Sequence, residues 1–310
     1  MSEGKEKKKQ HFVPKFYLKR FTYDDHRLFV FDKFKKKSYG SNINDVASER
    51  YFYDFPGDVA DQHSIDPQLI ENALSEIEDG FAKTVGSFLK RVQRETKRII
   101  KPRHKKAISY FIGLQSTRTK EHRRFQKQMI EGGMEALISK TREDDSDDEY
   151  FVEVDEDYVS LLQAMSMFNP YFQRQLTKVL QNHIWLLGVN NTTQPLYTSD
   201  HPIVKMPHKK DPHQIQSHSG FASEGIEIAL PLTPKYILIL CERTFHKHFV
   251  SKDGRSIALD SNGVTYYNSL QVSQSYRQVY CSSNSFVLAK EMCNQHPELC
   301  EPDRTRILID

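Results

Sequence analysis

A long repeat of apolar residues between Asp66 and Val92 constrains the fold more than any other feature of this chain. Its members recur three and four residues apart, as they do along one face of an amphipathic helix. They are Leu69, Ile70, Ala73, Leu74, Ile77, Phe81, Val85, Phe88 and Leu89. Asp66 can cap the helix and Pro67 suits its first turn. The stretch therefore predicts one long helix with a single apolar face.

Two further helices are expected before the middle of the chain. Pro102 separates the first helix from a second one at roughly residues 105–138. A third runs over about residues 157–181, and Asn169–Pro170 is where such a helix would break.

After Asn182 the pattern changes to short apolar runs separated by turns. Residues 184–200, "IWLLGVNNTTQPLYTSD", hold two such runs around an Asn-Asn-Thr-Thr turn, which indicates a hairpin. Residues 226–242 repeat the pattern, with Thr233–Pro234 as the break. The patterns together predict an α+β fold in one domain over residues 10–300. Helices are concentrated in its N-terminal part and antiparallel hairpins in its C-terminal part.

The composition indicates a globular chain. Of the 310 residues 38% are hydrophobic, and 19 Phe and 15 Tyr can fill a core. We find no apolar run long enough to span a membrane and no apolar segment of a signal peptide. Four cysteines in a chain of this length do not indicate a disulfide framework, so we expect a reducing, cytoplasmic location.

Charge is strongly segregated, although the net charge is only +3. Residues 90–127 hold 14 Lys or Arg against two Glu, whereas residues 143–157 hold ten acidic side chains. We expect a disordered basic tail at residues 1–9 and a mobile acidic loop at about residues 141–157. The charged runs are either solvated faces or an anion-binding surface that the acidic segment can shield. On the second reading, residues 90–127 dock nucleic acid or another anionic partner.

The second helix carries polar residues on a face that begins apolar. Extending the spacing of Ile108, Phe111 and Ile112 reaches Gln115, Arg118 and His122. A buried Arg118 must find a carboxylate, backbone carbonyls or a ligand. It belongs either to an internal network with Glu71 or Glu78 or to a functional site.

Two short motifs supply further candidates. In "HFVPKFYL" His11 lies where an extended entry meets a helical turn at Pro14, and is either a structural group or an acid–base group. In "YTSDHP" Asp200 follows a strand, where it can hold a cation, act as a base or pair with Arg118.

Other histidines and cysteines give weaker signals. His201, His208, His213 and His218 have the irregular spacing of solvated loop residues. Cys293, His296 and Cys300 are zinc ligand types, but only Cys281 stands near as a fourth. The signatures of P-loop, Rossmann, zincin and serine-hydrolase proteins are absent from the sequence.

The motifs as a set resemble the family known as domain of unknown function 4238. The similarity rests on "HFVPKFYLKRF", "ERYFYDF", "IENALSEIE", "GLQSTR", "YTSDHP", "LPLTP" and "NSLQVSQSYRQVYCSS", which run from about residue 10 to 285. The chain departs from the family pattern at Thr119–Lys120, where a proline is commonly expected, and in the acidic insertion at 143–157.

The resemblance implies a single full-length domain and no established activity. It also implies that the polar landmarks of the family map onto six residues, which are His11, Glu78, Gln115, Arg118, Ser199 and Asp200.

Two hypotheses for function follow. The first is a phosphodiester-directed, nuclease-like hydrolase whose catalytic residues are His11, Glu78 and Asp200. In it Gln115, Arg118 and Ser199 bind substrate, and a divalent cation such as Mg²⁺ is an expected cofactor. The alternative is a non-catalytic binding module that docks an anionic partner, with Arg118 in a structural network. The sequence leaves the oligomeric state open.

Overall fold

The helix expected over residues 66–92 is present as α3 (Leu69–Val92) in the computed structural model. It buries the expected face, including Leu74, Phe81 and Phe88. The structure describes residues 7–55, 64, 66–94, 99–141, 151–209 and 219–306.

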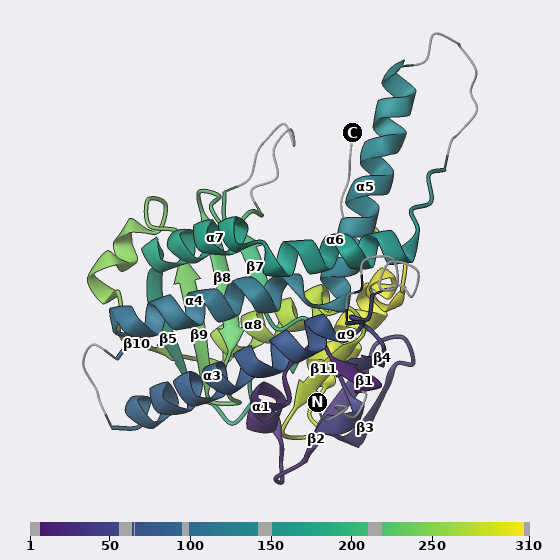
Figure 1. Ribbon diagram of the computed structural model, residues 1–310. Helices are drawn as coiled ribbons and strands as arrows, with labels where there is room; N and C mark the ends of the chain where they lie inside the picture. Colours follow the sequence, from purple (N-terminus) through teal and green to yellow (C-terminus); the bar gives the residue numbers. More distant parts are fainter. Residues whose placement is uncertain are drawn as a thin grey trace.

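The second predicted helix is in fact two helices. The first, α4 (Pro102–Thr117), ends at Arg118, and α5 (Lys120–Thr141) starts two residues later and projects from the body (Figure 1). The third is divided into α6 (Glu156–Phe168) and α7 (Pro170–Asn182) at the expected place. There the Asn169 side chain accepts a hydrogen bond from the Phe172 backbone N–H and caps α7.

A five-stranded sheet forms the centre of the C-terminal half. Its order is β10 (Ser256–Leu259), β5 (Ile184–Asn190), β9 (Tyr236–Cys241), β8 (Ile226–Pro231) and β7 (Val204–Pro207). Only the β10–β5 pair among these is parallel. The sheet has a hydrophobic core on each face, and alternate residues of a strand enter one or the other because successive side chains point to opposite faces. Leu238 and Leu240 pack with α3, α4 and α7, whereas Ile237 and Ile239 pack with α8 (Ser261–Gln274).

A second sheet joins the two ends of the chain. Its order is β3 (Lys37–Asn42), β2 (Arg27–Asp32), β11 (Gln278–Cys281) and β6 (Thr198–Ser199), and every pair in it is antiparallel. The short strands β1 (Lys9–His11) and β4 (Ser48–Arg50) form a separate pair. The remaining helices are α1 (Lys15–Leu18) and α9 (Val287–Gln295).

The fold is α+β in one body, as predicted, but its layout differs from helices followed by hairpins. The chain begins with small sheets, the helices are central and the C-terminal sheet is mixed. The hairpin predicted over residues 184–200 does not form, because β5 pairs with β9 while β6 joins the other sheet. Asn190 holds the intervening loop instead, donating to the carbonyls of Gln194 and Pro234. The apolar pattern of a strand does not specify its partner.

Two predicted segments fall largely outside the described residues. These are the basic tail at 1–9, of which residues 1–6 are not described, and the acidic loop at 141–157, of which residues 142–150 are not described. The described part of the tail enters β1 at Lys9. In the acidic segment, the backbone N–H groups of Val152 and Val154 donate to Glu135 and Glu131 of α5. Among the described helices, none combines the length and the apolar character needed to cross a membrane.

Candidate functional site

Arg118 lies at the end of α4 with its guanidinium group enclosed by the protein. The residue is 1% exposed. Nη1 donates to Glu78 Oε1 at 2.8 Å, Nη2 donates to the His11 carbonyl at 2.6 Å, and Nε contacts the Tyr53 hydroxyl at 3.4 Å. Burial alone would lower the pKa of Arg118, but Tyr53 and Glu78 outweigh it and raise this pKa. The side chain is therefore a cation in which each of the three nitrogens makes a hydrogen bond.

His11 and Gln115 belong to the same group of residues. The His11 imidazole contacts the Ile43 carbonyl through Nε2 at 3.3 Å, and Gln115 Nε2 donates to the Phe12 carbonyl at 2.9 Å. Burial, helped by the charge of Lys15, lowers the pKa of His11 to about 4, so its imidazole is neutral at pH 7. Both side chains thus fasten the N-terminal segment to the core of the protein.

Ser199 and Asp200 lie at β6, where their hydrogen bonds go to a different part of the chain. The Asp200 carboxylate accepts three backbone N–H bonds of 2.7–2.8 Å from residues 276–278. Ser199 donates to Gln271 Oε1 at 2.7 Å. Burial raises the pKa of Asp200 to about 6, against the effect of the backbone N–H groups. The structure thus brings four of the six predicted residues together, whereas Ser199 and Asp200 hold the connection between α8 and β11.

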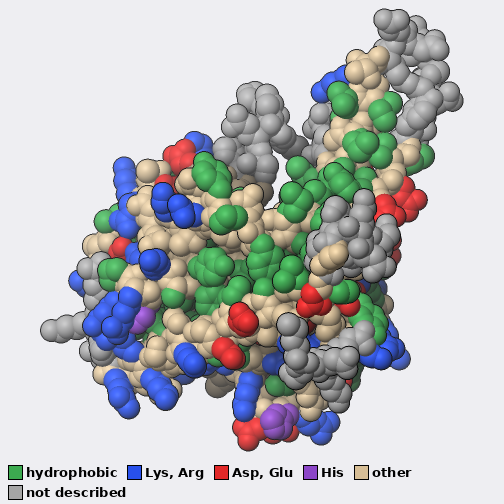
Figure 2. Space-filling view, in the orientation of Figure 1, with side chains coloured by type: hydrophobic (Ala, Val, Ile, Leu, Met, Phe, Trp, Pro, Cys, Tyr) green, Lys and Arg blue, Asp and Glu red, His purple; other side chains and the backbone are tan. Residues whose placement is uncertain are grey.

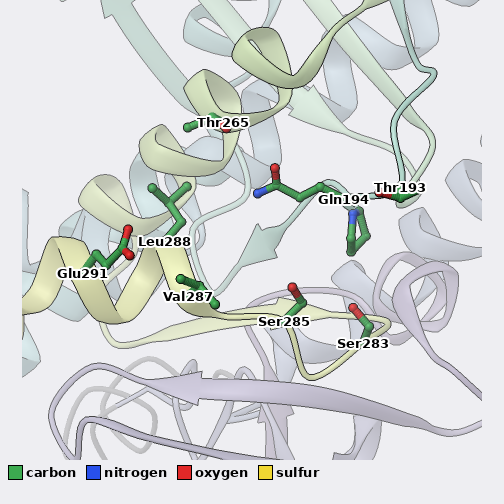
Figure 3. A pocket seen from close by; sticks show the side chains of 9 residues that line it. Thr193, Gln194, Thr265, Ser283, Ser285, Val287, Leu288 and Glu291 are labelled. Atoms are coloured by element: carbon green, nitrogen blue, oxygen red, sulfur yellow. The ribbon is translucent and has the colours of Figure 1, made fainter.

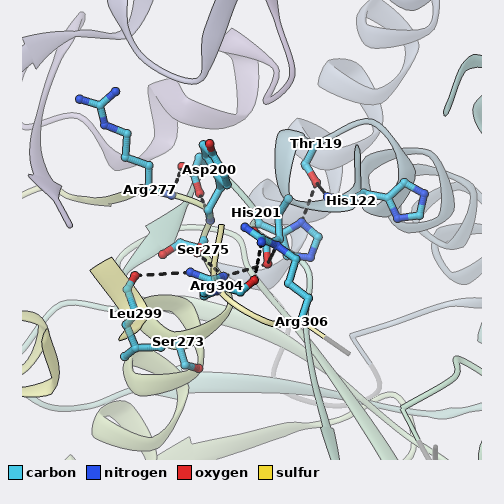
Figure 4. A network of polar contacts seen from close by, with 12 residues as sticks. Thr119, His122, Asp200, His201, Ser273, Ser275, Arg277, Leu299, Arg304 and Arg306 are labelled. Carbon is cyan, nitrogen blue, oxygen red and sulfur yellow. Dashed lines mark hydrogen bonds and ion pairs between the residues drawn. The ribbon is translucent and has the colours of Figure 1, made fainter. Parts of the chain in front are cut away.

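A further polar network surrounds His201 (Figure 4). His201 was expected to be a solvated loop residue, yet its Nδ1 lies 2.7 Å from the Thr119 hydroxyl and it is partly buried. Burial lowers the pKa of His201 to about 4, although the nearby Glu121 opposes the shift. Glu121 itself accepts hydrogen bonds from Arg304 at 2.8 Å and from Arg306 at 3.1 Å.

The chemistry open to this network is proton transfer between a hydroxyl and a neutral imidazole. His201 can accept the Thr119 proton at neutral pH because the imidazole is uncharged there. Thr119 is 0% exposed, however, so in this conformation a substrate has no contact with its oxygen. Residues 302–306, which carry both arginines, also bond to Gln128 of α5 and tie the chain end across this region.

A surface with a large excess of positive charge is built from three segments, residues 90–94, 101–106 and 243–255. They contain eleven Lys or Arg and one carboxylate, Asp253. The Ile99 N–H donates to the Gly254 carbonyl, the Phe88 and His104 rings stand 5.3 Å apart, and Lys105 bonds Asp253 at 2.8 Å. These contacts bring the three segments to one end of the molecule, which we call the basic end.

Figure 2 shows Lys and Arg side chains gathered over the end of α3 and the start of α4. The exposed cations of the basic end are Lys90, Arg94, Lys101, Arg103, Lys106, Lys247, Lys252 and Arg255. The rest of the basic run at 90–127 lies elsewhere. Arg118 is internal, Arg123 lies over the Phe52 ring at 3.7 Å, and Arg124 and Lys127 contact Glu156. The run therefore forms several surfaces and interior contacts rather than one face.

Within the described residues, no group of three or more His, Cys, Asp or Glu side chains is placed to hold a metal ion. The candidate zinc ligands Cys281, Cys293 and Cys300 lie in an apolar cluster with Phe31 and Phe286. His296, the histidine of that motif, contacts Glu298 at 3.1 Å instead.

The comparison with known protein families gives one match. A family model described as a protein of unknown function (DUF4238) matches residues 9–285. The chain belongs to the DUF4238 family. No curated protein and no solved structure matches the chain.

The DUF4238 match includes the whole group around Arg118 together with Ser199, Asp200, Thr119 and His201. It ends before α9, so Arg304 and Arg306 lie beyond it. No local sequence pattern links His201 with Thr119, because the imidazole and the hydroxyl come from segments 82 residues apart. The departure from the family pattern at Thr119–Lys120 was the one available signal.

A hollow of about 550 Å³ in this DUF4238 protein lies between the β5–β6 loop, α8 and α9 (Figure 3). Its lining is mainly hydroxyl and amide groups, among them Gln194, Ser283 and Ser285, with Glu291 as its single charged side chain. None of the six predicted residues lines it. We therefore assign it no chemistry.

Proposed function

We propose that this DUF4238 protein binds nucleic acid, as a polyanion, through its basic end. The observation that carries the proposal is the concentration of eight exposed Lys and Arg side chains from three separate segments. The single carboxylate of these segments, Asp253, is already bonded to Lys105 and Arg243. The surface thus keeps a large positive excess after its internal pairs are counted.

A phosphate backbone suits this surface better than a small anion does. The cations are spread over the ends of two helices and a turn, which matches a ligand that carries charge at regular intervals. The N-terminus of α4 lies among them and adds the partial positive charge of the helix dipole. Such contacts recognise the backbone rather than the bases, so binding is expected to be weakly sequence-dependent.

The test measures binding of fluorescent single-stranded DNA, duplex DNA and RNA by anisotropy between about 50 and 200 mM salt. The variant Lys101→Glu/Arg103→Glu should weaken binding by at least about tenfold and reduce the slope of log K against log salt by about 2. A matched control, Lys35→Glu/Lys290→Glu, changes the charge equally at exposed positions on β2–β3 and α9. It should bind almost as the wild type does. Binding by the wild type that does not change with salt would overturn the proposal. So would equal affinities of the two variants for nucleic acid.

A hydrolase remains a second candidate, and the contact between Thr119 and His201 favours it. The residues first predicted for catalysis, His11, Glu78 and Asp200, are held in intramolecular bonds and would have to be released before acting. The same oligonucleotides, incubated with Mg²⁺, report cleavage. If His201→Ala abolishes a cleavage activity that His11→Ala retains, the Thr119–His201 pair is the catalytic group. Equal activity of the wild type and His201→Ala excludes the pair.

A further inference from the structure

Helix α5 exposes apolar side chains along its whole length. All 22 of its residues are described, and none of them is buried. Phe125, Met129, Met134 and Leu137 are 37%, 46%, 47% and 62% exposed. An isolated helix of this length is marginal in water, so its stability normally comes from burying one face. Within the described part of the chain, no side chain of α5 is fully buried.

The apolar surface continues from α5 onto the neighbouring helices. Figure 2 shows hydrophobic side chains along α5 and around its base. Ten of the seventeen large exposed hydrophobic side chains of the described chain fall between residues 125 and 172. On α6 and α7 they include Met165 and Tyr171, which are 61% and 72% exposed. A concentration of this kind marks an interaction surface.

Gly133, in the middle of α5, leaves room for the close approach of a partner helix. A glycine inside a helix costs roughly 1 kcal/mol relative to alanine. A Cβ added at Gly133 would meet nothing within 4 Å, so the packing of this chain does not require a glycine there. A second helix that approached α5 closely at this point would require one. Phe125, Met129, Gly133 and Leu137 recur every four residues and share one side of the helix.

The charges of α5 favour one orientation of such a partner. Residues 120–130 hold four Lys or Arg and one Glu, whereas residues 131–141 hold two Glu and one Lys. Glu156 contacts Arg124 and Lys127, and Glu49 contacts Lys120. Arg304 and Arg306 both pair with Glu121, so the first half of α5 keeps an excess of positive charge. Two copies of α5 attract each other when they run antiparallel and repel when they run parallel.

We propose that α5 pairs antiparallel with α5 of a second copy of this chain, crossing at Gly133 to form a two-fold dimer. The arrangement is self-complementary, as a two-fold interface must be. Met129 of each copy then packs against Leu137 of the other, and the surfaces of α6 and α7 extend the contact at either end. A helix of 22 residues is about 33 Å long. A stable interface buries about 800 Å² per partner, so α5 needs the added surfaces of α6 and α7 to reach that area.

The first experiment is sedimentation equilibrium of the full chain at about 10 µM. The wild type is expected at twice the chain mass of 36.3 kDa, and Met129→Glu/Leu137→Glu at the chain mass. The control, Leu69→Glu/Val287→Glu, alters two exposed apolar residues outside the surface, 51% and 65% exposed, and should remain dimeric. Circular dichroism checks that each variant is folded. A monomeric wild type, or a dimeric Met129→Glu/Leu137→Glu variant, overturns the proposal.

The second experiment tests the orientation by oxidative crosslinking. All four natural cysteines are buried, so an introduced cysteine on α5 reports the interface. Gly133→Cys should form a disulfide dimer, and Leu137→Cys alone should not. A mixture of Met129→Cys and Leu137→Cys chains should crosslink to each other. Efficient crosslinking of Leu137→Cys with itself indicates a parallel pair and overturns the antiparallel arrangement.

Discussion

Arg118 shows, at the scale of single residues, how one buried charge can organise a large part of this protein. Its three donor nitrogens reach α3, the β1 region and the Tyr53 hydroxyl, so it connects segments far apart in the sequence. The Tyr53 hydroxyl in turn donates to the Arg118 carbonyl at 2.7 Å, where α4 ends. Without the guanidinium group, the His11 carbonyl, the Tyr53 hydroxyl and the Glu78 carboxylate would each lose a hydrogen-bond donor.

We predict that Arg118→Ala lowers the free energy of unfolding by about 3–5 kcal/mol, as expected when one partner of a buried ion pair is removed. Urea denaturation followed by circular dichroism measures the loss. The matched control is Arg124→Ala, whose ion pair with Glu156 is partly exposed and worth about 1 kcal/mol or less. Equal stability of the two variants would contradict the structural role of Arg118.

His11 makes the stability of the protein depend on pH. Its pKa is about 4 in the folded protein, because of burial and of Lys15, against about 6.5 when unfolded. Below pH 6.5 the unfolded chain therefore binds a proton that the folded chain does not, and stability is lost as the pH falls towards 4.

When the pH falls from 7 to 5, the proton uptake of His11 in the unfolded chain should lower the free energy of unfolding by on the order of 1–2 kcal/mol. Denaturation curves at the two pH values are expected to differ less for His11→Gln than for the wild type. The exposed His26 provides the control substitution, His26→Gln. If His11→Gln keeps the full pH dependence, another group causes it.

At the scale of elements, the junction between α4 and α5 separates a part of the fold that helical periodicity predicts from a part that it does not. The apolar repeat correctly predicts a helix from about residue 105. The predicted helix, however, continues without a break through Arg118 and Thr119. The structure breaks there, because the carbonyls of Thr117 and Thr119 accept hydrogen bonds from Gln163 of α6. That donor comes from 44 or more residues away, so helical periodicity contains no trace of it.

The same junction predicts how α5 responds to proline. Thr119 stands at the N-cap position and its hydroxyl accepts from the His122 backbone N–H, which makes Lys120 the first helical residue. Proline is favoured at that position. Lys120→Pro should therefore change the melting temperature by only a few degrees, whereas Lys127→Pro, inside the helix, should cost about 3 kcal/mol. If calorimetry shows that Lys120→Pro and Lys127→Pro lower the stability by comparable amounts, Lys120 is not the first residue of α5.

The candidate site could be predicted only in part, for a related reason. The burial of Gln115 and Arg118 followed from their spacing, and the internal pairing of Arg118 with Glu78 was one of two readings left open. The basic end could not be found from residues 90–127 alone. Residues 243–255 reach it through contacts such as that between Gly254 and Ile99, which no local pattern records.

At the scale of the whole molecule, the second sheet ties β2 and β3, near the start of the chain, to β11, the last of the described strands. β2 lies between β3 and β11, and β11 lies between β2 and β6. Removing β11 therefore separates β2 from β6 and exposes the edges of both strands. Two fully buried side chains would also be lost, Tyr280 from the core beneath α3 and α4 and Val279 from the cluster around Phe286.

We predict that a chain ending at Ser275 does not fold, because it lacks β11 and the N–H groups that bond Asp200. A chain ending at Arg306 should fold as the wild type does. Two-dimensional amide NMR spectra distinguish them by the dispersion of their signals. A well-dispersed spectrum from the shorter chain would mean that β11 is dispensable.

The pairing of β2 with β11 also has a consequence during protein synthesis. Gln278 follows Asp32 by 246 residues, so at about 5–20 residues per second the ribosome needs roughly 12–50 s to deliver the partner strand. Throughout that interval the "LFVF" edge of the nascent β2–β3 hairpin is open to pairing with other chains. The growing polypeptide should therefore depend on chaperones that bind extended apolar strands, and slower, cooler expression should raise its yield of folded protein.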